Sequence, residues 1–167
     1  MIVLTYVDDC ILISKESSVI DEFIQSLKNG SENFDFTDEG TMSSYLGVDV
    51  SRLLDGNGFI LSQPYLIHQI IEALNLDPQT TKGPHGNTPV AYPLLGKDPD
   101  GLPRKAMWKY RSVIGMLGYL QGTSHRDIAM ATHQCARFNN DPKLSHERAV
   151  KRICKYLLDA KDKGIIF

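Results

Sequence analysis

The chain opens with Met1-Ile2-Val3-Leu4-Thr5-Tyr6-Val7-Asp8-Asp9-Cys10-Ile11-Leu12-Ile13-Ser14, where two adjacent carboxylates divide an apolar stretch. Both flanks are rich in β-branched and aliphatic residues, which predicts two short buried strands with Asp8-Asp9 in the turn between them. A carboxylate beside a core loses its hydration, so such a pair needs a positive partner, and a metal ion is the usual one. The alternative is a solvated hairpin turn, because Asp is a common turn residue. These residues alone leave both interpretations open.

The composition is that of an ordinary globular protein. The 167 residues can bury a core in one domain or two small ones, and 42% of them are hydrophobic and 23% charged. No apolar run approaches the ~20 residues that span a bilayer, and the first residues lack the basic start of a signal peptide. Three cysteines far apart indicate free thiols in a reducing compartment. We therefore expect an intracellular protein that is neither secreted nor membrane-bound.

The net charge of −2 hides an asymmetry between the two parts of the chain. Residues 1–103 hold 5 Lys+Arg and 15 Asp+Glu, a balance of −10. Residues 104–167 hold 13 Lys+Arg and 5 Asp+Glu, a balance of +8. Such an asymmetry points to a polyanionic partner for the basic part.

Apolar periodicity and turn signals predict the elements of the first part. In chain order these are a helix capped by Ser17 or Ser18 and ended by Asn29-Gly30, a strand over residues 34–37, two strands over residues 45–52 and 59–62 around a turn at residues 55–58, and a helix that begins at Pro64. Residues 77–103 hold six prolines, which favours an unpacked connector and a domain boundary there.

The last third reads as three helices. The first runs from Tyr110 to Leu120, and its Gly115 and Gly118 would let a neighbour approach closely. Ser124 and Asp127 resemble a capping box for the second helix. The apolar face of the third comprises Ala149, Val150, Ile153, Cys154 and Leu157. The predicted fold class is therefore α+β, with a small antiparallel sheet and helices over residues 1–76, a linker over 77–103 and a helical unit over 104–167.

Four cations of the third helix, Arg148, Lys151, Arg152 and Lys155, follow the spacing i, i+3, i+4, i+7. That spacing places them on one face, which could track a phosphate backbone. The alternative is a solvated helix surface. The five histidines show no metal-ligand spacing, and neither a nucleophile elbow nor a Gly-rich phosphate loop occurs.

Six motifs in sequence order resemble the reverse transcriptases of Ty1/copia-type retrotransposons. They are Tyr6-Val7-Asp8-Asp9 (the polymerase hairpin), residues 45–50 with Leu46 and Gly47 (the primer grip), residues 61–65, Thr88-Pro89, residues 110–120 (a thumb helix) and residues 146–157 (the final helix). The resemblance covers essentially all of the chain, and the order of the motifs makes it specific.

The resemblance implies part of a right-hand polymerase fold, with the palm remainder at residues 1–76 and the thumb at 104–167. It implies two-metal nucleotidyl transfer along an RNA template from a DNA primer, or on an RNA–DNA hybrid. Asp8 would be the main ligand of Mg²⁺ or Mn²⁺, and Asp9 a supporting one. Tyr6, Leu46 and Gly47 would contact the primer and template.

The family's fingers and a further catalytic aspartate precede the matched region. We therefore expect this chain to be inactive alone and to work with the missing fingers and palm portion of a polyprotein. Two alternatives stay open, which are a nucleic-acid-binding module without chemistry and a decayed structural domain.

Overall fold

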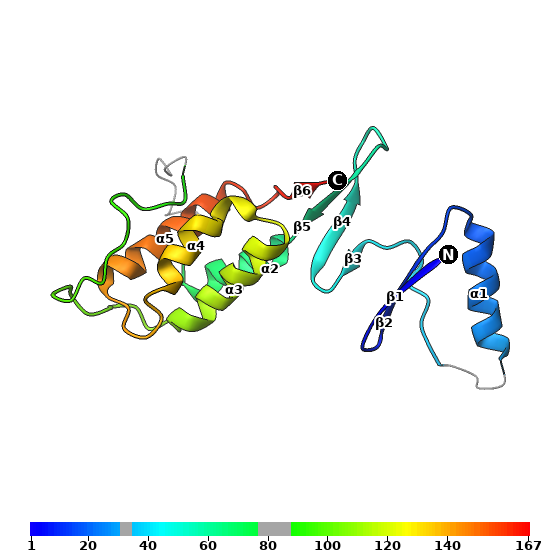
Figure 1. The fold of residues 1–167 in the computed structure, drawn as a ribbon, viewed down its shortest axis with the longest axis horizontal. Helices are drawn as coiled ribbons and strands as arrows, with labels where there is room; N and C mark the ends of the chain where they lie inside the picture. The colour runs from blue at the N-terminus through cyan, green and yellow to red at the C-terminus, as the bar shows by residue number, and fades with distance from the viewer. Residues whose placement is uncertain (31–34, 77–87) are drawn as a thin grey trace. The chain divides into compact units, whose positions relative to one another are not determined.

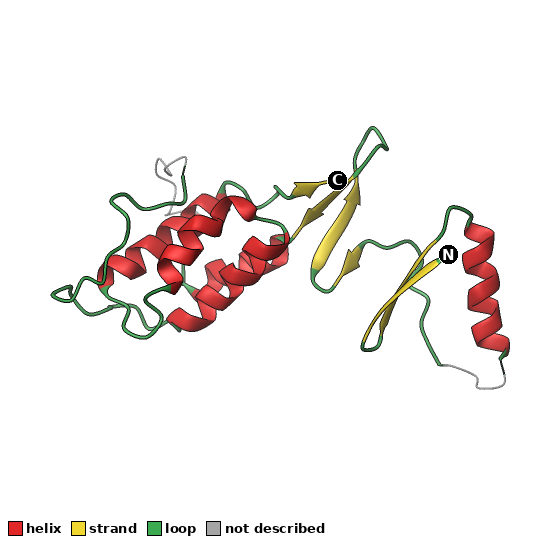
Figure 2. Cartoon of the chain, viewed as in Figure 1, coloured by secondary structure: helices red, strands yellow, loops and turns green. Residues whose placement is uncertain are grey.

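The computed structural model describes residues 1–30, 35–76 and 88–167. They divide into two compact units, Met1–Met42 and Ser43–Phe167 (Figure 1). The elements are β1 (Ile2–Tyr6), β2 (Asp9–Ile13), α1 (Ser17–Asn29), β3 (Ser44–Tyr45), β4 (Val48–Arg52), β5 (Phe59–Ser62), α2 (Pro64–Ala73), α3 (Tyr110–Thr123), the 3₁₀ helix η1 (Arg126–Ile128), α4 (Ala129–Ala136), α5 (Leu144–Leu158) and β6 (Ile165–Ile166). All strand pairs of the described residues are antiparallel, and the α+β class is confirmed (Figure 2). None of the described helices is long and apolar enough to cross a membrane.

The first unit contains the predicted hairpin and helix. β1 and β2 pair with Ile2 opposite Ile13 and Tyr6 opposite Asp9, so both strands are confirmed. Their predicted burial is wrong, because neither strand holds a buried residue. A two-stranded ribbon has two faces to cover, and α1 contributes no buried residue that could cover either.

The ends of α1 and the segment after it differ from the prediction. The helix ends at Asn29 as expected, but Glu16 occupies the N-cap position and makes no side-chain cap bond. Ser17 and Ser18 therefore lie within the first turn and do not cap it. Residues 35–37 form no strand, since no described strand pairs with them, and Phe34 lies outside the described residues.

The second unit begins with a four-stranded sheet in the order β3-β4-β5-β6. The predicted hairpin of β4 and β5 is confirmed, with Val50 opposite Leu61. The single strand expected over residues 45–52 is interrupted by a tight turn at Leu46 and Gly47, whose φ angles are +50° and +75°. β6 was not predicted, since its two residues depend on pairing with β5.

Four helices enclose the hydrophobic core of this unit. α2 packs on α3, α3 on α4, α4 on α5, and α5 on α2. The predicted apolar stripes are confirmed, because they supply the fully buried side chains Ile67, Ile70, Val113, Leu117, Leu120, Val150, Ile153, Cys154 and Leu157. Burying one such aliphatic side chain contributes about 1.5–3 kcal/mol, so we expect these helices to supply most of the folding free energy.

Two sequence interpretations in the helical part are wrong. Ser124 does not cap the second helix, because it lies at the C-cap of α3 and its hydroxyl donates to Gln63 Oε1 at 2.9 Å. A 3₁₀ turn precedes α4 there. No described neighbour approaches Gly115 or Gly118 closely, since a Cβ on either would meet no atom within 4 Å.

The connector is packed where the structure describes it. Residues 88–103 hold no helix or strand, as expected. However, Val90, Ala91 and Leu95 pack against the helical core, so the expectation of an unpacked crossing is wrong for them. The division of the chain falls after Met42 and not within this segment.

Candidate functional site

The turn of the first hairpin consists of Val7 and Asp8. The prediction that Asp9 also lies in the turn is wrong, because Asp9 pairs with Tyr6 as the first residue of β2. Val7 has a φ of +54°, a left-handed conformation that is a genuine outlier for a β-branched residue. Its side chain is 92% exposed, so packing does not hold it there. Backbone strain of this kind concentrates at functional positions. The strained turn presents both carboxylates and the half-exposed Tyr6 to solvent.

Asp8 and Asp9 match a divalent cation in donor type but not in number. Carboxylate oxygen is the donor that Mg²⁺ prefers, and Mg²⁺ demands a near-octahedral ligand set. Within residues 1–30, 35–76 and 88–167, no group of three His, Cys, Asp or Glu could hold a metal ion. Two carboxylates are fewer ligands than a divalent cation requires.

The Leu46–Gly47 turn is exposed, and the helical part of the same unit holds it. The Tyr119 hydroxyl donates to the Leu46 carbonyl at 2.8 Å, and Gln63 Nε2 donates to the Gly47 carbonyl at 3.4 Å. Sequence reasoning missed both contacts. Gln63 itself was a signal for a contact of this kind. Gln is an unusual residue at the position before a helix, so its side chain was free to bind a group outside the helix.

The four cations predicted on α5 do not form one free face. Arg148 and Lys155 are exposed and make no ion pair in the described part of the chain. Lys151 Nζ lies 2.8 Å from Glu147 Oε1, and Arg152 Nε donates to the Thr88 carbonyl at 3.1 Å. Two of the four cations are thus available to an anionic partner, while the other two are half-buried and engaged.

Glu147 is a buried ionic centre that the sequence analysis did not single out. Burial alone would raise the pKa of its carboxyl, but the Lys151 ammonium and the backbone N–H groups of Ala106 and Lys105 together hold the pKa below its usual range. Arg104 Nε lies 3.8 Å from Glu147 Oε2. The carboxylate therefore fastens the segment before α3 onto α5, which is a structural role.

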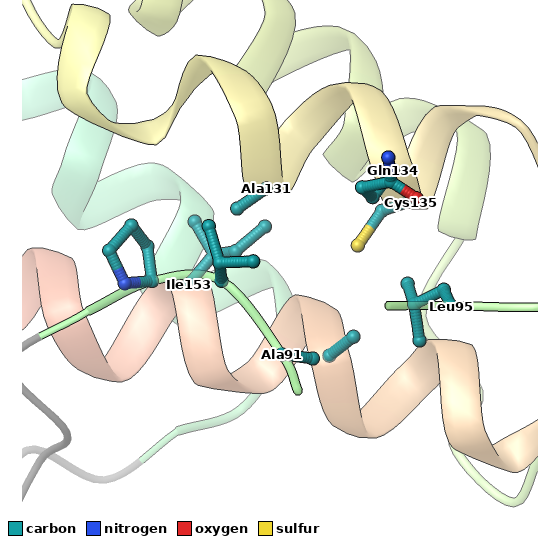
Figure 3. Close-up of a pocket in the computed structure, with 9 residues that line it drawn as sticks. Ala91, Leu95, Ala131, Gln134, Cys135 and Ile153 are labelled. Atoms are coloured by element: carbon teal, nitrogen blue, oxygen red, sulfur yellow. The ribbon is translucent and has the colours of Figure 1, made fainter. Parts of the chain in front are cut away.

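The buried thiols and the adjacent hollow offer no chemistry. Burial raises the pKa of Cys135 to about 12 and raises the pKa of Cys154 as well, so both stay protonated at neutral pH. The hollow beside Cys135 is lined by Leu95, Ala131 and Ile153 among others (Figure 3). Its free volume of about 10 Å³ is close to that of one water molecule, which excludes a substrate there.

Comparison with known proteins gives the family. The profile described as "Reverse transcriptase (RNA-dependent DNA polymerase)" matches residues 1–90, which is more than half of the chain. The chain therefore belongs to the reverse transcriptase family. Within this family it is a segment of the copia type, as the transposon polyproteins that it resembles show.

Three relatives come from plants and yeast. The retrovirus-related Pol polyprotein from transposon TNT 1-94 of Nicotiana tabacum is 30% identical over 94% of this chain. That from transposon RE1 of Arabidopsis thaliana is 29% identical over 97%, and the putative transposon Ty5-1 protein of Saccharomyces cerevisiae is 24% identical over 91%. The chain spans only 12%, 10% and 47% of their respective lengths. No solved structure matches it.

Proposed function

We propose that this chain contributes the Asp8-Asp9 hairpin and a nucleic-acid-binding unit to RNA-directed DNA synthesis. The observation that carries the proposal is the strained, exposed turn at Val7-Asp8, which lies within the region matched by the reverse transcriptase family. Reverse transcriptases as a class act on nucleic acids with divalent metal ions. Asp8 is the main ligand of Mg²⁺ or Mn²⁺, Asp9 supports it, and Tyr6 borders the primer terminus.

The proposed reaction is two-metal nucleotidyl transfer, in which one cation activates the primer 3′-hydroxyl and the other steadies the triphosphate. Two cations need more ligands than Asp8 and Asp9 provide. A further carboxylate therefore comes from another palm segment of the Pol polyprotein, together with the fingers. In this proposal residues 1–76 belong to the palm, 77–103 connect and 104–167 form the thumb. The setting is intracellular, in keeping with the free thiols of Cys10, Cys135 and Cys154.

A chimera tests the catalytic part. This chain replaces the matching segment of the tobacco polyprotein, and DNA synthesis is measured from an RNA template with a DNA primer. We expect Asp8→Asn to lower the rate at least about a hundredfold, because metal ligation supplies several kcal/mol of transition-state stabilisation. Asp21→Asn is the matched control, since Asp21 is an exposed carboxylate on α1. Equal rates for the two variants would refute the role of Asp8.

The isolated chain provides a second arm of the same assay. We expect the isolated chain to incorporate no nucleotide, because it lacks the remaining metal ligands. Incorporation by the wild-type chain that Asp8→Ala abolishes would show that the chain holds a complete site, and would overturn this part of the proposal.

A second function, nucleic-acid binding without chemistry, is favoured by the exposed cations Arg148 and Lys155. Each phosphate neutralised adds about 0.7–0.9 to the slope of log affinity against log salt concentration. We therefore expect Arg148→Ala/Lys155→Ala to flatten the slope for an RNA–DNA hybrid by roughly 1.4–1.8. The control is Lys15→Ala/Lys97→Ala, which removes the same charge from two exposed lysines. A wild-type affinity that is independent of salt would contradict binding and favour the decayed structural domain.

A further inference from the structure

The turn between β3 and β4 has a backbone that its sequence does not favour. Tyr45 pairs with Val48, so Leu46 and Gly47 are the two central residues of the turn. Both have positive φ, as in the type I′ turns that join antiparallel strands. Gly47 adopts this conformation freely, but Leu46 does not, because its Cβ crowds the backbone in the left-handed region. Contacts from outside the turn must therefore hold Leu46.

The first such contact comes from the C-terminal half of α3. The Tyr119 hydroxyl donates to the Leu46 carbonyl at 2.8 Å, across a sequence separation of 73 residues. Tyr119 is itself 48% exposed, but its helix is fixed by the fully buried Leu117 and Leu120 on either side of it. The hydrogen bond thus links a strained, exposed turn to a helix that is anchored in the buried core.

The second contact runs through a buried amide. Gln63 is 1% exposed and makes no cap bond to its own helix α2. The Gly47 carbonyl can only accept, so Nε2 of Gln63 faces it at 3.4 Å, and Oε1 accepts the Ser124 hydroxyl at 2.9 Å. A buried amide needs such partners, because an unpaired one is costly to desolvate. Both carbonyl groups of the turn are therefore bonded to donors on the helical side.

We propose that Tyr119, Gln63 and Ser124 are positioning residues that hold the Leu46–Gly47 turn in its left-handed conformation for contact with a primer strand. The proposal rests on the proposed function and on the primer and template contact that the family resemblance implies for Leu46 and Gly47. Its physical basis is electrostatic as well as geometric. A carbonyl oxygen repels phosphate, but here both carbonyl oxygens of the turn accept hydrogen bonds from protein donors. The exposed Leu46 side chain and the remaining backbone groups of the turn can therefore contact the primer strand.

A matched pair of tyrosine variants tests the first contact. Tyr119→Phe removes only the hydroxyl that donates to Leu46. Tyr65→Phe is the control, since Tyr65 is 71% exposed and its hydroxyl makes no hydrogen bond among the described residues. We expect Tyr119→Phe to weaken binding of an RNA–DNA hybrid to the full chain by roughly threefold to tenfold, the range of one hydrogen bond, while Tyr65→Phe binds as the wild type does. Equal affinities for the two variants would overturn the proposal, whatever their unfolding temperatures.

A second readout follows the turn itself. In a glycine-¹⁵N-labelled chain, we expect the Gly47 amide signal to shift when the hybrid is added, and to be displaced by Tyr119→Phe even without nucleic acid. A Gly47 signal that Tyr119→Phe leaves unchanged would count against the positioning role. Ser124→Ala should weaken hybrid binding and Ser124→Thr, which keeps a hydroxyl, should restore it. Equal loss in both variants would exclude the Ser124–Gln63 link.

The salt experiment separates this inference from the proposed function. If Arg148→Ala/Lys155→Ala weakens binding but Tyr119→Phe behaves as Tyr65→Phe does, only the positioning role fails. If the wild-type chain does not bind the hybrid at all, the binding function fails and the positioning role fails with it.

Discussion

The two units of this chain differ in burial and in the candidate functional residues that each carries. Met1–Met42 carries the Asp8-Asp9 turn, yet none of its described residues is buried. Ser43–Phe167 carries the closed helical core, with the exposed cations Arg148 and Lys155 on its surface. A sequence motif such as Tyr6-Val7-Asp8-Asp9 can thus be recognised in a segment whose described residues form no buried core. The folding free energy of the chain should come nearly entirely from the second unit.

The strongest test of this contrast is a pair of leucine truncations. Leu117→Ala removes a side chain that is fully buried between helices, and should lower the free energy of unfolding by about 2–5 kcal/mol. Leu4→Ala removes a side chain that is 50% exposed on β1, and should change it by less than about 1 kcal/mol. Urea denaturation followed by circular dichroism measures both. Similar losses for the two variants would show that the hairpin is buried in the protein in solution.

A substitution at Glu147 tests how α5 holds the segment that precedes α3. Because the folded state lowers the pKa of this carboxyl, its contribution is fully present above the ordinary value of 4.5 and is lost as the pH falls through the lower folded value. Glu147→Gln should lower the free energy of unfolding by about 1.5–3 kcal/mol at pH 7, the range for hydrogen bonds to a charged group. The difference from wild type should shrink in acid below pH 4.5. Urea titrations at several pH values check this, and a difference that is independent of pH would contradict the ionic role.

Two glycines of the second unit should respond to alanine substitution with opposite changes in stability. A Cβ on Gly164 would lie 2.1 Å from the Leu61 carbonyl oxygen, so Gly164→Ala should displace β6 and cost about 1–3 kcal/mol. Gly115 lies in the middle of α3 with open space beside it, so Gly115→Ala should stabilise the chain by about 0.5–1 kcal/mol. Thermal unfolding distinguishes the two signs. A stabilising Gly164→Ala would mean that β6 does not pair with β5.

Much of this fold could be predicted from residue patterns, because its main elements have strong local signals. The stripe of α5 and the start of α2 at Pro64 are examples, as is the hairpin of β4 and β5. Elements that depend on distant partners could not be predicted from such local patterns. β6 has only two residues and exists through its pairing with β5. Ser124 follows a capping pattern, but its hydroxyl bonds to Gln63, which lies 61 residues earlier.

The candidate site was predictable to a different degree in each unit. The hairpin around Asp8 follows from local sequence, but the position of Asp9 within β2 and the exposure of both strands do not. On α5, helical spacing predicted one face of four cations, but it could not show that the Thr88 carbonyl accepts a hydrogen bond from Arg152. Glu147 and Lys151 are four residues apart, so their ion pair had a local signal that the pattern of positive charges obscured. The hydrogen bond from Tyr119 to Leu46 had no local signal, because only the fold brings these two residues together.

RNA-templated DNA synthesis by the chimera with the tobacco polyprotein is the most direct test of the central claim. We expect synthesis with the wild-type segment and with Asp21→Asn, and a loss of at least about a hundredfold with Asp8→Asn. Synthesis by the Asp8→Asn chimera at the rate of the Asp21→Asn control would contradict the claim that this hairpin supplies the catalytic carboxylates.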